Sequence, residues 1–291
     1  MEGNAAQAIS RLRGMDEFKI LAQKLELVAE NRRNLSAARI RLPNYLFAVA
    51  PGCGVTSHIH QFARLLDELG LMMFEGEKRC FEWIIDDKAF ETKGAFDRLL
   101  EHVRRMAGFR SAFSGVIGVD VEDWVNKPDA EAFNRLLDFV EDMHDQIIFV
   151  FVVDMHAEEK LWNMARRLSG EMPLELVHFP MPSAEELMLT VVDFLQERGF
   201  AVDADGQACL LEIMPRLMSM EGFDGYQSLD NLTDEIIYHV CSVRQVREAC
   251  ISRADLQFID APGGYMERFE HPSDGRYGKK RRIGFQAGRN A

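Results

Sequence analysis

A glycine-rich turn between a strand-like and a helix-like segment carries the residues most able to do chemistry in this sequence. Residues 49–56 read Val-Ala-Pro-Gly-Cys-Gly-Val-Thr, between an apolar run and a stretch with helical periodicity. In such a setting, backbone N–H groups and a helix N-terminus can bind a phosphate group. The residues that would contact phosphate are Pro51, Gly52, Cys53, Gly54, Val55, Thr56 and Ser57.

The turn departs from the phosphate-loop motif GxxxxGK[ST] at two positions. Val49 replaces the first glycine and Val55 replaces the lysine. Lysine supplies a cation to the terminal phosphates of a nucleotide, whereas valine presents only a branched apolar group. Cradling by the backbone could survive, and Thr56 could still offer its hydroxyl to a magnesium ion. By itself the segment is equally compatible with a plain structural turn.

The composition limits the classes of partner. The 291 residues carry a formal net charge of −13, which disfavours a general nucleic-acid binder because duplex phosphates would be repelled. No apolar run approaches the roughly 20 residues of a membrane-spanning helix. Five cysteines are widely spaced and never form a CxxC pair, which is typical of reduced thiols. We therefore expect a cytoplasmic protein that contacts neither membrane nor nucleic acid.

The first 180 residues alternate between strand-like and helix-like patterns. Strands with nearly continuous apolar runs, separated by helices, indicate a parallel sheet covered on both faces. The fold class is therefore α/β, with the glycine turn following the first strand. Strands are predicted at residues 46–50, 81–85, 116–119, 147–153 and 174–179, and helices at 15–33, 59–69, 95–106 and 130–143.

The pattern changes after residue 180, where only helical segments follow. Ser183 and Glu186 have the spacing of a capping box, which marks the start of a helix. Helices are predicted at residues 184–198, 206–220 and 229–250, and a looser glycine- and proline-containing tail follows. The predicted organisation is an N-terminal helical segment (1–35), an α/β core (36–181), a helical lid (182–250) and a C-terminal tail or arm (251–291).

The order of these elements resembles that of AAA+ ATPases, and most closely the CbxX/CfqX group that includes the stage V sporulation protein K type. Residues 50–56 are similar to the family's phosphate loop Asn-Pro-Gly-Thr-Gly-Lys-Thr. Residues 177–187 are similar to the start of the family's lid, where Phe-Pro precedes Ser-x-Glu-Glu-Leu. Residues 223–232 look like its lid segment Phe-Gly-Asn-Ala-Arg-x-Val-Arg-Asn-Leu. The resemblance implies a P-loop AAA+ core with a small all-helical lid.

The resemblance also implies where a magnesium ion and a catalytic base would lie. In the family, a strand ends in a paired Asp-Glu, which here corresponds to Asp120 followed by Val121. Thr56 and Asp120 are then the candidate magnesium ligands. Glu122 is the nearest carboxylate that could replace the missing glutamate. It could act only if the strand ends at Asp120. In a continuing strand, Glu122 would point to the face opposite to that of position 121, where the family has its glutamate.

Other functional positions of the family carry changed residues. The polar sensor at the end of the strand at 147–153 falls on or beside Asp154, which would repel phosphate. The sensor arginine of the lid falls on Gln227, and the next family arginine on Asp230. The arginine finger, which acts on a neighbouring subunit, corresponds to Arg166 or Arg167.

These losses favour a degenerate AAA+ module that does not hydrolyse ATP. We expect it to act as a regulatory or structural subunit in a homo- or hetero-oligomer, beside a protein partner such as an active AAA+ ATPase. Two alternatives stay open. In one, the chain is an ATP-binding remodelling ATPase in which Arg64 or a basic tail residue replaces the lysine. In the other, it is a nucleotide-free structural adaptor. ATP or ADP with magnesium, and no cofactor at all, are therefore equally compatible with the sequence.

Overall fold

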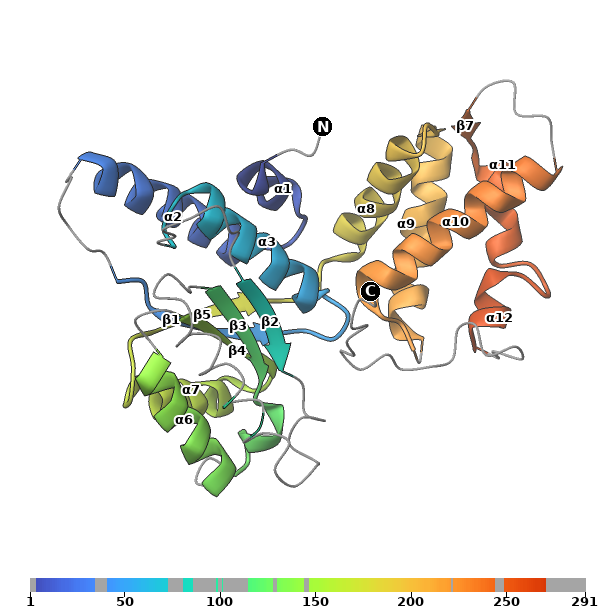
Figure 1. The fold of residues 1–291 in the computed structure, drawn as a ribbon. Coiled ribbons are helices and arrows are strands. Elements are labelled where there is room, and N and C mark those ends of the chain that lie inside the picture. Colours follow the sequence, from blue (N-terminus) through green and yellow to red (C-terminus); the bar gives the residue numbers. More distant parts are fainter. Residues whose placement is uncertain are drawn as a thin grey trace. The chain divides into compact units, whose positions relative to one another are not determined.

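The chain forms two compact units, each with its own apolar core. The computed structural model in Figure 1 describes residues 4–34, 41–72, 81–85, 98, 101, 115–127, 130–143, 147–220, 222–243 and 249–270. We call the first unit, Met1–Ala50 with Val55–Pro180, the sheet unit. We call the second, Pro51–Gly54 with Met181–Ala291, the helical unit. The tip of the glycine turn therefore groups with the helical unit.

The sheet unit is built on a parallel five-stranded sheet, as predicted. Its strand order is β2-β3-β4-β1-β5, and every neighbouring pair is parallel. The inner strands are apolar almost throughout because both faces of the sheet are covered. The strands are β1 (Asn44–Val49), β2 (Phe81–Ile85), β3 (Gly115–Asp120), β4 (Ile147–Asp154) and β5 (Leu174–Phe179).

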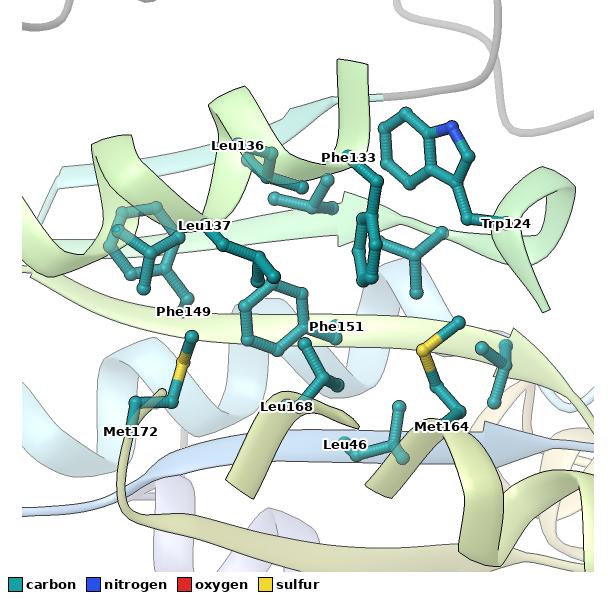
Figure 2. Packing of buried hydrophobic residues seen from close by; sticks show 14 of the residues in the cluster. Leu46, Trp124, Phe133, Leu136, Leu137, Phe149, Phe151, Met164, Leu168 and Met172 are labelled. Carbon is teal, nitrogen blue, oxygen red and sulfur yellow. The ribbon is translucent and has the colours of Figure 1, made fainter. Parts of the chain in front are cut away.

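One face of the sheet packs against α6 (Glu131–Met143) and α7 (Glu158–Ser169). Figure 2 shows the ring of Phe151 and the side chain of Leu46 directed toward the helical side chains of this layer. Trp124, from the short helix η1 (Glu122–Trp124), lies against Phe133 with ring centroids 5.0 Å apart. This layer forms one continuous apolar cluster that reaches the ends of β3 and β4.

The opposite face is covered by α2 (Asp16–Asn34) and α3 (Val55–Glu68), and α1 (Ala5–Arg11) packs on these two helices. Because side chains alternate along a strand, Tyr45 and Phe47 of β1 point to this face, away from Leu46. Their rings meet Phe62 of α3 at centroid distances of 4.9 and 6.0 Å. The first helix, α1, lies within the predicted N-terminal helical segment (1–35), ahead of the helix predicted at 15–33.

The helical unit is made of α8 (Ala184–Glu197), α9 (Ala204–Ser219) and α10 (Gly225–Val243) with shorter elements after them. The predicted capping box is confirmed: Ser183 Oγ accepts a hydrogen bond from Glu186 N, and Ser183 N donates to Glu186 Oε2. The shorter elements are β6 (Ala201–Val202), β7 (Cys250–Ile251), α11 (Arg253–Leu256), η2 (Gln257–Ile259) and α12 (Tyr265–Glu270).

Two predictions differ from the structure, and two others concern residues outside its described part. The helix predicted at 229–250 begins earlier, at Gly225, and Cys250 lies in β7 because it pairs with Ala201 of β6. The looser tail predicted after residue 250 instead contributes Leu256, Ile259 and Tyr265 to the apolar core of the helical unit. Most of the helix predicted at 95–106 lies outside the described residues, as do the basic tail residues 279–282, which one alternative offers as a replacement for the lysine. None of the helices described here has the length and apolar character needed to traverse a bilayer.

Candidate functional site

The glycine turn has the backbone of a strand–turn–helix phosphate loop. Gly52 and Gly54 have φ angles of +77° and +69°, in the left-handed region that favours glycine. The chain leaves β1 at Val49 and enters α3 at Val55. The predicted turn is therefore present, and its two glycines are needed for its conformation.

The lysine position at the start of α3 supplies no cation. Val55, at the lysine position, is only 8% exposed, and Thr56 is half-buried. Arg64 is the cation that the alternative hypothesis offers in place of the lysine. Its guanidinium lies 3.5 Å from the carboxylate of Glu68, which follows Arg64 by one helical turn. The N-terminus of the helix keeps its partial positive charge, but the charge complement that a triphosphate needs is not present in this turn.

The strand-end aspartate lies where the sequence predicts it. Asp120 is the last residue of β3, and its Oδ1 accepts a hydrogen bond from Glu122 N at 3.0 Å. Val121 extends the ladder by one bond, from its N–H to Val152 O, and its side chain is completely buried in the apolar cluster. The position that would carry the activating glutamate therefore faces the core.

Glu122 is turned back toward the edge of the sheet and held there. The strand does end at Asp120, which was the condition for Glu122 to return. Its Oε2 accepts a hydrogen bond from Asp154 N at 2.8 Å, and its Oε1 lies 2.7 Å from His156 Nε2. Both oxygens are thus engaged by the end of β4. To activate water, Glu122 would have to give up a contact that joins two strands.

Carboxylates gather along the carboxyl edge of the sheet, where β4 lies between β1 and β3. Asp154 is in register with Val49, the last residue before the glycine turn. Desolvation raises the pKa of Asp154, the charge of Glu122 raises it further, and His156 opposes them. Together with Asp120, these side chains form a net acidic edge at the ends of β3 and β4, beside Val49, and negative charge there opposes a polyphosphate bound in the turn.

Replacing Asp154 with asparagine is expected to stabilise the protein at pH 7. Because the folded-state pKa of Asp154 is raised, its ionised form costs stability above that pKa. This cost disappears as pH falls below the unfolded-state pKa. We expect a rise in Tm of about 1–3 °C at pH 7, kept small by solvent screening, and little difference near pH 4.

Thermal unfolding of wild type and Asp154→Asn at both pH values measures this effect. Asp123→Asn, which removes an exposed carboxylate from the neighbouring short helix η1, is the matched control. An equal or larger gain from the control, or a gain independent of pH, would contradict the explanation.

The two candidate finger arginines of α7 differ in their surroundings. Arg167 donates to Glu171 Oε1 at 2.7 Å and to Asn134 Oδ1 at 2.9 Å, so it joins α7 to α6. Arg166 is exposed, and its guanidinium makes no ion pair or hydrogen bond within the described part of the chain. Of the two, Arg166 is the one that can reach another molecule without breaking an internal contact.

In the helical unit, the positions of the family's arginines serve local structure. Gln227 Nε2 lies 3.4 Å from Asn231 Oδ1. Asp230 pairs with Arg198 at 2.5 Å, and Asp234 lies 3.3 Å from the same guanidinium. Arg198, at the end of α8, was not identified from the sequence, and no motif marks it, because its partners are 32 and more residues away.

A cavity of about 330 Å³ lies away from all of these residues. It is lined by residues of α1 and α2, among them Asn4, Gln7, Lys19 and Glu26. None of the predicted site residues takes part in it. Among the described residues, no cluster of three or more histidine, cysteine or carboxylate side chains could hold a metal ion.

Known proteins similar to this chain are AAA+ proteins. A CfxQ homolog from Galdieria sulphuraria is 26% identical over 131 residues, which are 43% of each chain. The chloroplastic ribulose bisphosphate carboxylase/oxygenase activase of Cyanidioschyzon merolae is 23% identical over 194 residues, 65% of this chain and 63% of that protein. The matches thus span less than two thirds of these relatives. No protein-family model matches the chain.

Solved structures support the same fold. A mutant RuvB from Thermotoga maritima superposes with a TM-score of 0.53 at 15% identity, covering 85% of this chain and 70% of RuvB. The AAA domain of FIGL-1, solved in complex with ADP, gives a TM-score of 0.52 at 16% identity and covers 83% and 80% of the two chains. The fold is therefore the P-loop AAA+ α/β fold, and the sequence relatives support the CbxX/CfqX-like assignment.

Proposed function

We propose that this chain, an AAA+ module similar to the CfxQ homologues, has lost ATP hydrolysis and acts as a regulatory or structural subunit beside an active AAA+ ATPase. One observation carries the proposal: Val121, at the position of the activating glutamate, is buried in the apolar core. An apolar side chain there cannot polarise water, and the nearest carboxylate, Glu122, is held by the end of β4.

The surroundings of the loop support the proposal. The start of α3 offers a hydroxyl from Thr56 but no cation at the lysine position, Val55, and Asp154 adds negative charge beside Val49, where the glycine turn begins. Phosphoryl transfer depends almost entirely on positioning and on neutralising phosphate charge. Thr56 and Asp120 could contribute to a magnesium site, but they do not match the charge of a nucleoside triphosphate.

The proposal includes a hetero-oligomer or homo-oligomer in a reducing compartment such as the cytoplasm. None of the four described cysteines takes part in a disulfide. In such an assembly, Arg166 would reach the nucleotide of a neighbouring subunit. The chain would then stimulate a partner's ATPase while hydrolysing nothing itself.

Replacing Arg166 with alanine is expected to abolish stimulation of an active CfxQ-type ATPase from the same cell. An arginine that stabilises the phosphoryl-transfer transition state contributes roughly a thousandfold or more to turnover. Phosphate release by the partner, measured with each variant added, gives the effect. Arg167→Ala is the control, since it removes a neighbouring cation that is bonded to Glu171 and Asn134. Unchanged partner turnover with Arg166→Ala would remove the finger role from the proposal.

The alternative of an ATP-binding remodeller needs a cation in place of the missing lysine. Arg64 is paired with Glu68, and the basic tail lies outside the described residues. Calorimetry with MgATP separates the two functions. Micromolar affinity that is lost in both Thr56→Ala and Asp120→Ala would favour the alternative.

A further inference from the structure

The tip of the glycine turn is held by the first turn of α10. Both segments belong to the helical unit. The backbone N–H of Tyr226 donates a hydrogen bond to the carbonyl oxygen of Gly52 at 3.2 Å. The first amides of a helix have no acceptor within the helix. The Gly52 carbonyl therefore serves as the acceptor for one of them, at the end where the helix dipole is positive.

The two backbones approach so closely that only glycine fits on either side. A Cβ atom on Gly225 would lie 1.9 Å from Gly52 O, and one on Gly52 would lie 2.4 Å from Gly225 N. Both are backbone atoms, so no side chain can move to make room. Gly225 also has a positive φ of +44°, as Gly52 does. Each glycine is thus required twice, for its conformation and for the contact.

The first turn of α10 is itself held firmly. Asp224 N donates to Ser228 Oγ at 2.8 Å, and Ser228 is buried. The carbonyl of Ser228 accepts a hydrogen bond from the hydroxyl of Tyr265 at 3.3 Å. A residue of α12, nearly 40 positions away, therefore helps to fix the turn that meets Gly52.

We propose that Gly52, Gly225 and Tyr226 form a latch that holds the tip of the glycine turn against α10 without nucleotide. The inference rests on the proposed function, because a chain that does not cycle ATP has no step that requires this contact to open. Backbone atoms of α10 contact the turn directly, so this contact forms without a bound phosphate between the two segments.

Hydrogen exchange of the Tyr226 amide in the wild-type chain tests the latch without any substitution. This amide has no helical acceptor, so its protection reports the bond to Gly52. We expect exchange slowed roughly tenfold or more relative to the unstructured rate, equally with and without MgADP or MgATP. Exchange at the unstructured rate, or protection that appears only with nucleotide, would overturn the proposal.

Gly225→Ala provides a second test, read out through the thiol of Cys53. Cys53 is only 1% exposed in the same turn, and burial raises the pKa of its thiol to about 11. Opening the latch is expected to speed its labelling by N-ethylmaleimide roughly tenfold relative to the exposed Cys241 in the same molecule.

Gly222→Ala is the matched control for this variant. Gly222 has a φ of +93°, but a Cβ there would meet nothing within 4 Å. It therefore carries the backbone strain without the collision. Equal labelling of Cys53 in both variants, or no change in Gly225→Ala, would count against the latch. If Gly225→Ala does not fold, the wild-type exchange measurement decides.

Failure of the latch and failure of the proposed function are distinguishable. ATP turnover by the wild-type chain would refute the loss of hydrolysis while leaving nucleotide-independent protection of Tyr226 intact. An unprotected Tyr226 amide in a chain without turnover would refute only the latch.

Discussion

Replacing Val121 with glutamate, which restores the family's paired Asp-Glu, is expected to destabilise the protein by about 4 kcal/mol at pH 7 rather than to restore catalysis. Val121 is fully buried beside Trp124 and Phe133. A carboxyl placed there must stay protonated, and protonating a group of ordinary pKa near 4.3 at pH 7 costs about 4 kcal/mol. That is a large part of the roughly 5–15 kcal/mol by which domains are stable.

The pH dependence identifies the cause of this destabilisation. The introduced carboxyl has a raised pKa in the folded state, so the cost is greatest at neutral pH and shrinks as pH falls toward 4. Urea unfolding at pH 5 and pH 7 measures it. Asn126→Glu adds the same charge at an exposed position nearby and is expected to change stability little. A stable Val121→Glu variant would show that position 121 faces solvent.

Replacing Val55 with lysine is expected to strengthen nucleotide binding without producing turnover. A hydrogen bond to a charged group contributes about 1.5–3 kcal/mol, so the affinity for MgADP should rise roughly ten- to hundredfold. Val55 lies at the start of α3, where a long side chain can extend from a buried stem to the surface. We expect this variant to release no phosphate, because Val121 supplies no base.

Calorimetry with MgADP and MgATP measures the nucleotide affinity, and phosphate release measures turnover. Val55→Met lengthens the side chain without adding charge and is the control. An equal gain in affinity from methionine would show that shape, not charge, limits binding. Phosphate release by Val55→Lys would show that a functional base exists, with Glu122 the first candidate.

The fold could be predicted because its signals are local. Apolar runs such as residues 147–153 mark strands covered on both faces, and the Ser183–Glu186 spacing marks the start of the helical unit. The short strand at Cys250 could not be predicted, because a two-residue strand depends on pairing with Ala201, far away in the chain. The core positions of Ile259 and Tyr265 were hidden by the glycines and prolines around them.

The candidate site could be predicted in its positions but not in its contacts. The resemblance to the family places Asp120 and Asp154 at the ends of two strands, as observed, and the structure shows that these strands are neighbours. It gave no sign that His156 would hold Glu122, because that pair joins the ends of two different strands. The contact between Gly52 and Gly225 was equally invisible. Glycine pairs are common in turns, and only three-dimensional proximity separates these two from the rest.

The central claim is that this AAA+ module does not hydrolyse ATP, and steady-state phosphate release by the purified wild-type chain with MgATP tests it most directly. The Thr56→Ala and Asp120→Ala variants give the background rate of phosphate release, because each lacks one of the two residues that could hold magnesium. The account predicts that wild type and both variants release phosphate at the same background rate. Turnover by the wild type that both variants abolish would contradict it.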